Sequence, residues 1–243
     1  MNRFTDIHHH LTYGVDDGPS AWEGTERMLL AACKNGIGKI IATPHVSPGR
    51  REFDLPDYLA KVKQMNAYCA QKGLPLSIYS GAEIFYTEAT LRFLDAGRIP
   101  TLAGMRYVLL EFKPDVTFDW IYAAVRTLMN EGYYPVLAHI ERYDCLVRHV
   151  ERVYELRDFP NLRLQINCST VIKPHGFFFV KKFCERLFHE QMIDYVATDS
   201  HNTHARAVNM HEAYRVLRER YGLRYAAQLT GLNQDEILNL SVQ

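Results

Sequence analysis

A pair of histidines separated by one residue lies near the start of the chain, at the end of a short apolar segment. His8 and His10 belong to the run Asp-Ile-His-His-His. If residues 4 to 11 form a strand, alternate side chains share a face, so His8 and His10 point together and His9 points away. Two imidazoles on one face of a rigid strand supply half of a metal site. The spacing alone leaves open whether this pair binds a metal.

Histidine and carboxylate side chains also stand at the ends of later apolar segments and in the loops that follow them. The full set of candidate metal ligands is His8, His10, Asp17, His45, Glu83, Glu111, His139, Asp199 and His201. Each residue alone has an ordinary explanation as a helix cap or a buried polar group. Together on one rim, they would concentrate charge that needs cations to neutralise it. Nitrogen and oxygen ligands without thiolates suit Zn²⁺, Mn²⁺ or Fe, and bridging carboxylates suit more than one ion.

The elements that would position these side chains are short apolar segments, rich in β-branched and aromatic residues, that alternate with helical patterns. The expected strands cover residues 4–8, 39–43, 76–82, 107–111, 134–139, 162–167 and 195–199. Their nearly continuous hydrophobicity predicts parallel strands covered on both faces. Only the strand that ends at Asn167 lacks a His, Asp or Glu at or just after its end. In a barrel the carboxyl ends of the strands meet on one face, which would bring the candidates together.

Helical patterns fill the intervals between the expected strands. Ser20 and Glu23 form a capping-box pattern that predicts a helix running to about residue 35, with Gly36 ending it. Further helices are expected over residues 54–72, before Gly132, over 181–191 and over 206–221. The alternation predicts an α/β fold, either a barrel or a doubly wound sheet. Seven strands and a helical tail favour a distorted (β/α)7 TIM-like barrel, and the lack of a linker or repeat favours a single domain over 1–243.

The composition is that of a globular protein without a strong charge bias. The chain has 243 residues, 47% of them hydrophobic, and its 28 Lys and Arg balance its 28 Asp and Glu. Zero net charge argues against a nucleic-acid binder with a basic surface. No apolar run approaches the roughly 18 residues that span a bilayer, and the N-terminus lacks the apolar core of a signal peptide. We therefore expect a cytoplasmic protein that does not insert into a membrane.

The cysteines give a negative result that bears on chemistry. They are Cys33, Cys69, Cys145, Cys168 and Cys184, and no Cys-x-x-Cys pair occurs. An odd and scattered set predicts neither a disulfide framework nor a thiolate zinc site. None is followed, after five intervening residues, by the arginine that cysteine-dependent phosphatases place beside their thiolate. If the protein handles phosphate, we expect it to do so without a cysteine nucleophile.

The motifs taken together resemble the polymerase-and-histidinol-phosphatase (PHP) superfamily. They are Asp-Ile-His-His-His, Asp-Asp-Gly-Pro, Ala-Thr-Pro-His, Gly-Ala-Glu-Ile, Leu-Glu-Phe, Ala-His-Ile-Glu-Arg-Tyr and Ala-Thr-Asp-Ser-His-Asn. More narrowly, the chain is similar to the bacterial metal-dependent protein tyrosine phosphatases of capsule and exopolysaccharide systems. Gly-Ala-Glu-Ile and His-Ile-Glu-Arg-Tyr are specific to that branch, and the match spans residues 6–206. The resemblance implies a distorted (β/α)7 barrel, in agreement with the strand count.

The resemblance also implies three divalent metal ions, with Mn²⁺ expected first and Fe or Zn²⁺ as alternatives. The ligands it implies for the first ion are His8, His10, Glu83 and Asp199. Glu83 would bridge to a second ion completed by Glu111 and His139, and the third would be held by Asp17, His45 and His201. Arg142 and Arg206 match the family's phosphate-contacting arginines. A planar guanidinium is suited to that role because it meets two phosphate oxygens at once.

We expect hydrolysis of phosphotyrosine by a metal-activated water, without a phosphoenzyme. The resemblance implies a phosphotyrosine protein as partner, namely the tyrosine kinase of a polysaccharide export system. Phe85, Tyr86 and Tyr143 would either form an aromatic wall for the substrate ring or pack in the core.

Three other functions compete with this interpretation. A small-metabolite phosphatase, such as a histidinol-phosphatase, would use the same ligands with a more closed pocket. An amidohydrolase barrel also begins with His-x-His, but it expects a bridging lysine where this chain has Glu111 and a histidine where it has Asn167. A metal-bound regulatory module would bind metal without turnover.

Overall fold

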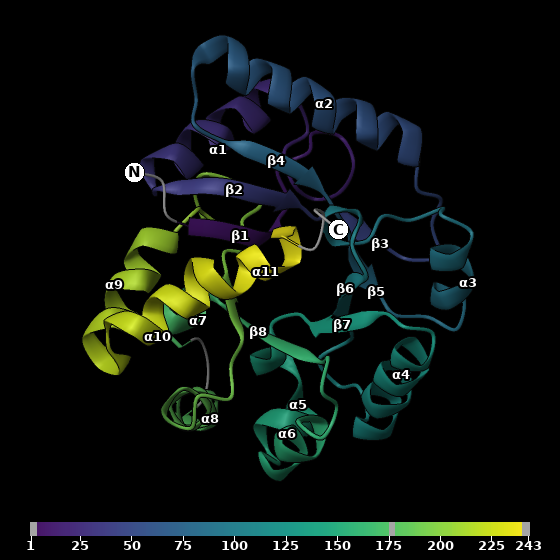
Figure 1. Cartoon of the computed structure of the whole chain (residues 1–243), viewed down its shortest axis with the longest axis vertical. Helices are drawn as coiled ribbons and strands as arrows, with labels where there is room; N and C mark the ends of the chain where they lie inside the picture. Colours follow the sequence, from purple (N-terminus) through teal and green to yellow (C-terminus); the bar gives the residue numbers. More distant parts are fainter. Residues whose placement is uncertain (1–3, 175–177, 240–243) are drawn as a thin grey trace.

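The strands in the described part of the chain all pair in parallel and form two sheets. The computed structural model describes residues 4–174 and 178–239 (Figure 1). The smaller sheet has the order β1-β2-β4, formed by Phe4–His9, Ile37–Ala42 and Ser77–Ser80. The larger has the order β3-β5-β6-β7-β8-β9, formed by His45–Val46, Glu83–Phe85, Tyr107–Glu111, Tyr134–Leu137, Arg163–Asn167 and Tyr195–Ala197. The result is an α/β protein with a curled parallel sheet.

Each segment expected to be a strand contains one, and two further short strands, β3 and β5, follow the segments expected over 39–43 and 76–82. The chain breaks between β2 and β3 around Pro44, and between β4 and β5 around Gly81. A proline has no N–H to continue the hydrogen-bond ladder. A Cβ on Gly81 would meet Ile41 Cγ2 at 2.7 Å, so the chain can pass this close only as glycine. The two breaks turn the strands so that β3 and β5 join the larger sheet.

The first and last strands meet at their carboxyl ends. His9 and Ser200 form an isolated parallel bridge. The Asp199 N–H donates to the His8 carbonyl at 2.9 Å, and the His10 N–H donates to the Ser200 carbonyl at 2.9 Å. The beginning and the end of the strand series are thereby held together on the side where the candidate ligands lie.

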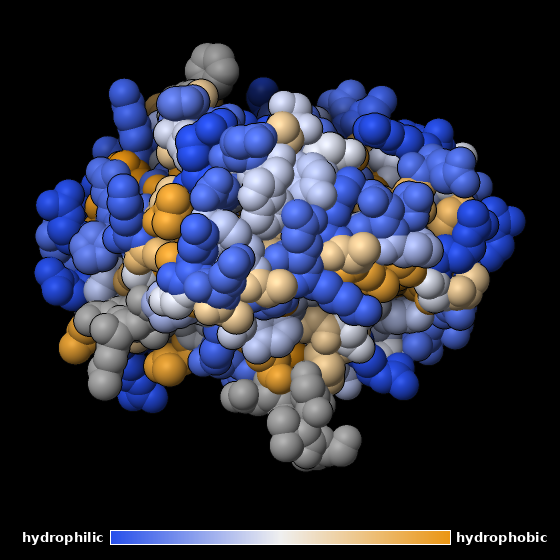
Figure 2. Space-filling model, turned by 90° about the horizontal axis from the view of Figure 1, so that it is seen from above, coloured by the Kyte–Doolittle hydropathy of each residue, from blue (hydrophilic) through white to orange (hydrophobic). Residues whose placement is uncertain are grey.

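Helices cover the outside of the strands (Figure 1). They are α1 Trp22–Lys34, α2 Leu55–Lys72, α3 Thr90–Asp95, α4 Phe118–Asn130, α5 Asp144–Val147, α6 Glu151–Leu156, α7 Cys168–Ile172, α8 Phe178–His189, α9 Met210–Tyr221, α10 Leu223–Ala227 and α11 Asn233–Asn239. Short turns of other helix types occur at η1 Leu102–Gly104, η2 Ile140–Arg142 and η3 Gln228–Leu232. None of the helices in the described ranges has the length and apolar character needed to cross a membrane. Figure 2, which looks onto the face carrying α2, shows mostly hydrophilic side chains there.

Three helix starts differ from the sequence prediction, and one of them is that of α8, which covers Phe178–His189 where the sequence predicts a helix over 181–191. The prediction of a capping box at Ser20 is wrong, because α1 has Ala21 at its N-cap position and no side-chain hydrogen bond caps the helix. The last expected helix starts at Met210 instead of residue 206. The Arg206 carbonyl accepts hydrogen bonds from the N–H groups of His201 and Asn202, which hold that segment in a turn. The helix expected over 54–72 is confirmed within one residue, and it ends at the left-handed Gly73, with a φ of 62°.

The interior of the curled sheet is filled by alternate residues of the strands. Ile7, Ile41, Leu109 and Val136 are fully buried in this cluster. The C-terminal α11 closes the cluster with Ile237, which is also fully buried. The Asp235 carboxylate fixes α11 by accepting from Thr5 Oγ1 at 2.7 Å and from Lys39 Nζ at 3.0 Å. Because Thr5 and Lys39 lie early in β1 and β2, α11 covers the amino ends of the strands and leaves the carboxyl ends free for the site.

Candidate metal centre

The candidate ligands lie together at the carboxyl ends of the strands, where the sequence predicts them. His8 lies on β1, Glu83 opens β5 and Glu111 closes β6. The others lie in β3 or in the loops after β1, β7 and β9, and they are His10, Asp17, His45, His139, Asp199 and His201. Within the described residues, all of these candidates except His139 fall into three overlapping groups, and the ligand atoms of each group lie within 4.8 Å of one another.

The first group consists of His8, His10, Glu83 and Asp199. The Nε2 atoms of His8 and His10 are 3.1 Å apart, and His8 Nε2 lies 3.2 Å from Glu83 Oε1. Asp199 Oδ1 lies 3.4 Å from His8 Nε2 and 3.5 Å from His10 Nε2. Ligands of a tetrahedral ion with bonds of about 2.1 Å lie about 3.4 Å from one another. The spacing therefore fits a shared metal ion better than a set of direct hydrogen bonds.

Glu83 also faces a second group of ligand atoms. His139 Nε2 lies 2.7 Å from Glu83 Oε1 and 3.6 Å from Glu111 Oε1. His45 Nδ1 lies 2.9 Å from Glu83 Oε2 and 3.5 Å from Glu111 Oε2. A carboxylate that faces two ligand groups can bridge two ions. His45, which the resemblance assigns to the third ion, thus contacts the second group as well.

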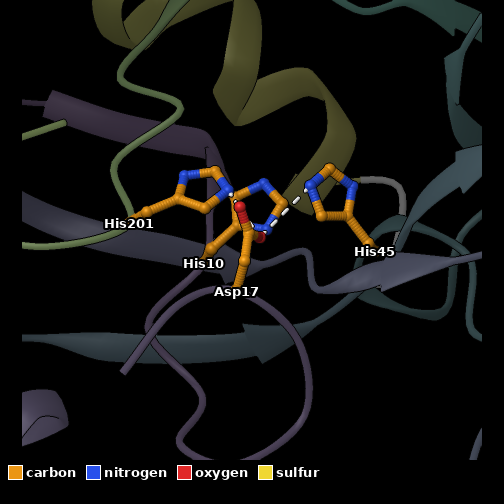
Figure 3. A group of neighbouring side chains, drawn as sticks. All are labelled: His10, Asp17, His45 and His201. Atoms are coloured by element: carbon orange, nitrogen blue, oxygen red, sulfur yellow. Dashed lines mark ion pairs between the residues drawn. The ribbon is translucent and has the colours of Figure 1, made fainter. Parts of the chain in front are cut away.

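The third group joins His10, Asp17, His45 and His201 (Figure 3). Asp17 Oδ1 lies 3.2 Å from His201 Nε2 and 3.4 Å from His45 Nε2. The rings of His10 and His201 stack with centroids 3.7 Å apart. Figure 3 shows the three imidazoles gathered around the Asp17 carboxylate, which reaches them from the loop after β1.

Two candidate ligands sit on left-handed backbone. His139 has a φ of 31° and Asp199 a φ of 51°. A residue other than glycine in this region costs on the order of 1 to 3 kcal/mol and persists only where its surroundings fix it. The Gln165 Oε1 atom accepts from the His139 N–H at 2.9 Å, and the His8 carbonyl accepts from the Asp199 N–H at 2.9 Å. The fold thus holds both side chains over the rim despite an unfavourable conformation.

Neighbouring charges in the cluster shift the pKa values of its side chains. Burial alone would lower the pKa of His8, but the Glu83 and Asp199 carboxylates raise it to about 9. Burial alone would raise the pKa of Glu83, but the surrounding imidazoles, His8 foremost, hold it well below its usual range. Burial and the neighbouring His10 lower the pKa of His201 to about 2. The Glu83 and Asp199 carboxylates, whose pKa values are both lowered, therefore stay ionised at neutral pH, as metal ligation requires.

Residues behind the ligands orient the imidazoles, and the sequence prediction missed them. Asp16 Oδ2 accepts from His10 Nδ1 at 2.6 Å and from the His45 N–H at 3.0 Å. Gln165 Oε1 accepts from His8 Nδ1 at 3.2 Å. The two ring bonds hold a proton on Nδ1 of His8 and of His10, so that Nε2 is the ring nitrogen that faces the first group and would give up its proton to a metal ion. The strand that ends in Asn167 also contributes, because Asn167 Nδ2 donates to Asp199 Oδ2 at 2.8 Å.

Arg142 and Arg206 both reach the rim. Arg142 Nη2 donates to Asp199 Oδ2 at 2.7 Å, and Arg206 Nη2 donates to Asp199 Oδ1 at 3.2 Å. Arg206 Nη1 also donates to Asp17 Oδ2 at 3.0 Å. The side chains of Arg142 and Arg206 are 42% and 36% exposed, so each guanidinium touches a candidate ligand and still faces solvent. A phosphate on this rim would meet two guanidinium groups.

Two further side chains singled out in the sequence are not part of the rim. His9 is fully buried, and its Nδ1 bonds the Asp6 carboxylate at 2.9 Å, so it packs behind the strand as expected. Tyr143 is fully buried too, and its hydroxyl accepts from the Phe112 N–H at 3.2 Å. Tyr143 therefore belongs to the core, whereas Phe85 and Tyr86 line an open cavity.

The chemistry of the donor set fits metal ions. The three groups contain only imidazole and carboxylate ligands. In the described part of the chain, Glu83 Oε2 and His201 Nε2 are buried and form no hydrogen bond of regular geometry, although each lies close to titratable side chains of the cluster. Buried polar atoms left in this way ordinarily have an ion or water as their missing partner. A curled parallel α/β sheet with such ligands and two arginines at its strand ends is typical of metal-dependent hydrolases.

The chain belongs to the family described as capsular polysaccharide synthesis, CpsB/CapC, whose model matches residues 4–239. It is 33% identical to the tyrosine-protein phosphatase CpsB of Streptococcus pneumoniae over 237 residues, which cover 96% of this chain and 97% of that protein. This relationship confirms the branch that the sequence motifs indicate.

Solved structures show the same relationship. A structure from the work on YwqE of Bacillus subtilis and CpsB of Streptococcus pneumoniae, described as unique metal-dependent tyrosine phosphatases, matches with a TM-score of 0.87 and 29% identity. That match covers 97% of this chain and 94% of the other. Histidinol phosphate phosphatase from Lactococcus lactis matches with a TM-score of 0.57 and 18% identity over 92% of this chain and 94% of its own. At that identity the likeness extends to the fold alone.

Proposed function

We propose that this protein is a metal-dependent protein tyrosine phosphatase, a phosphoric monoester hydrolase that uses no cysteine nucleophile. The observation that carries the proposal is the convergence of histidine and carboxylate ligands with Arg142 and Arg206 on one rim. Membership of a family with relatives named tyrosine-protein phosphatases supports the substrate class.

The proposed centre holds three divalent ions, with Mn²⁺ first and Fe or Zn²⁺ as alternatives. His8, His10, Glu83 and Asp199 would hold one ion, Glu83, Glu111 and His139 the second, and Asp17, His45 and His201 the third. When bound, such ions supply Lewis acidity and activate water for attack on phosphorus. The spacing of the first group and the lack of a regular hydrogen bond at the buried Glu83 Oε2 support this assignment.

The chain's own residues bind and orient the substrate. Arg142 and Arg206 donate to the phosphate oxygens and balance the charge that spreads over them during in-line displacement. Asp199 holds both guanidinium groups at the rim before substrate arrives. Asp16 and Gln165 keep the ring protons of His10 and His8 away from the ligand positions. Loss of Arg206 should therefore weaken phosphate binding or turnover while leaving the metals in place.

The finer description of the fold and cellular setting is also a proposal. We take the curled sheet to be a distorted (β/α)7 barrel that forms one domain over 1–243, supported by the His9–Ser200 bridge. All five cysteines are free, which suits the reducing cytoplasm. The partner would be a phosphotyrosine protein, namely the tyrosine kinase of a polysaccharide export system, and the family's description as capsular polysaccharide synthesis supports it.

The test compares kcat/KM for a phosphotyrosine peptide and for histidinol phosphate, with Mn²⁺ and with a chelator. We expect a strong preference for the peptide and loss of turnover on chelation. A preference for histidinol phosphate would retain the metal centre but assign the protein to small-metabolite chemistry. Turnover that survives complete metal removal would overturn the metal mechanism.

A further inference from the structure

A cavity of about 590 Å³ opens beside the candidate metal centre, and we call it the lateral cavity. Its wall continues the strands that carry two of the ligands. β5 runs from Glu83 to Phe85, and Phe85 pairs in register with Glu111. Phe112 follows Glu111 directly, and the Tyr86 N–H donates to the Glu111 carbonyl at 3.0 Å. A chain bound in the lateral cavity would therefore lie immediately beside the rim.

The lateral cavity has an aromatic wall. The rings of Tyr86 and Phe112 have centroids 5.6 Å apart, and those of Tyr86 and Trp120 are also 5.6 Å apart. Trp120 is 39% exposed and Phe85 is partly exposed, so these rings present apolar surface to an incoming chain. Partly exposed aromatic side chains supply contact area at a small entropic cost, which is why they recur where proteins bind peptides.

The edge of the lateral cavity is basic. Arg50, Arg92 and Lys113 line it together with Glu88 and Asp115. A neighbouring cavity of about 240 Å³ shares Arg50 and adds Arg51 and Arg98 against one carboxylate, Glu52. Cations thus outnumber carboxylates on this surface, although the whole chain has zero net charge.

These cations are available for a partner. Within residues 4–174 and 178–239, none of the arginines or the lysine lining the two cavities forms an ion pair with a carboxylate, whereas Lys61, Arg157 and Arg186 elsewhere do. The Arg50 guanidinium instead lies over the Phe85 ring, 5.0 Å from its centroid. Since Phe85 pairs with Glu111, Arg50 stands at the border between the lateral cavity and the metal centre.

We propose that the lateral cavity binds the residues flanking the phosphotyrosine of a protein substrate, and that Arg50 selects acidic residues there. The inference rests on the proposed function and adds a sequence preference to it. The aromatic wall takes the apolar part of the flanking chain, and the unpaired guanidinium takes its carboxylate. Charge complementarity argues for an acidic segment over a basic one, because a basic segment would face Arg50, Arg92 and Lys113.

The experiment uses three substrates with the Mn²⁺-loaded full chain. Two are phosphotyrosine peptides of equal length, with either glutamate or glutamine at the flanking positions, and the third is free phosphotyrosine. At low ionic strength we expect kcat/KM about two- to fivefold higher for the glutamate peptide, the effect of one partly exposed ion pair. Arg50→Gln should remove this preference through KM and leave free phosphotyrosine unchanged. The matched control Arg218→Gln, on the exposed face of α9, should behave as wild type.

Charge reversal gives the sharpest result. Arg50→Glu should prefer a peptide with flanking lysines to the glutamate peptide, and added salt should weaken both preferences. The inference is overturned if wild type hydrolyses the two original peptides equally, or if Arg50→Gln retains the preference. An equal loss on all three substrates would assign Arg50 to the phosphate site instead. Absence of turnover on every substrate would overturn the proposed function itself, an outcome distinct from the loss of peptide preference alone.

Discussion

Glu83 connects more of the candidate centre than any other side chain described above. It is fully buried, and its two oxygens lie between 2.7 and 3.3 Å from the nearest nitrogens of His139, His45, His8 and His10. A carboxylate in this position neutralises several imidazoles and reaches both neighbouring ligand groups. The centre should therefore depend on Glu83 more steeply than on a ligand that belongs to one group.

Glu83→Ala should reduce metal content and lower turnover by more than about a hundredfold, since even the partners behind metal ligands are worth about 10- to 100-fold. Metal content per chain and kcat for a phosphotyrosine peptide measure the two effects. Glu219→Ala, which changes an exposed carboxylate on α9, is the control. Near-normal activity of Glu83→Ala would show that the site assignment is wrong.

Asp16 should act through the ligands that it orients. Its carboxylate is held by His10 Nδ1, the His45 N–H and the Gly18 N–H, at 2.6, 3.0 and 2.9 Å. Asp16→Asn should weaken metal affinity by about 10- to 100-fold, because the amide no longer fixes the ring proton of His10 as a charged acceptor does. Titration of the chelated protein with Mn²⁺ would measure this change. Activity at saturating Mn²⁺ should recover, and failure to recover would mean that Asp16 has a direct role.

The elements show which parts of the fold follow from sequence and which do not. Strand positions could be predicted because apolar β-branched runs are local signals, and the gathering of the candidate ligands could be predicted because they stand at or after the ends of those runs. The breaks at Pro44 and Gly81 could not, since a close approach such as that of Gly81 to Ile41 exists only in the packed structure. The roles of Asp16 and Gln165 were missed for the same reason, because a hydrogen-bond partner depends on tertiary neighbours.

The C-terminal helix α11 offers a test of whether packing at the amino ends of the strands affects metal binding at their carboxyl ends. Ile237→Ala would open a cavity in a fully buried site at the amino ends and should cost about 2 to 5 kcal/mol. For a chain of this size that lowers Tm by roughly 4 to 20 °C. Thermal unfolding and metal content measure the outcome. Metal binding at low temperature should be unchanged, and its loss would show that the ends are coupled.

Across the whole molecule, the cysteines are packing residues and not nucleophiles. Burial raises the pKa of the thiols of Cys33 and Cys145, and raises that of Cys69 to about 11. It also raises the pKa of Cys168 well above its usual range and that of Cys184 strongly. A raised pKa means that the reactive thiolate forms only at higher pH, so these thiols are protonated at neutral pH.

A thiol alkylator at neutral pH should therefore react slowly and leave activity largely intact. For Cys69 the alkylation rate should rise as the pH approaches about 11. The measurement compares residual activity with the number of alkylated cysteines per chain, which is determined by mass spectrometry. Inactivation in proportion to one labelled cysteine would support a thiol mechanism after all.

The bridge between His9 and Ser200 joins two segments that are synthesised far apart in time. His8 and His10 leave the ribosome early, but Asp199, which completes their group, is made almost 200 residues later. Because domains are synthesised from the N-terminus, the early histidines must wait through most of translation without their final partner. A nascent chain that ends before Asp199 therefore lacks one of the four side chains of the first group.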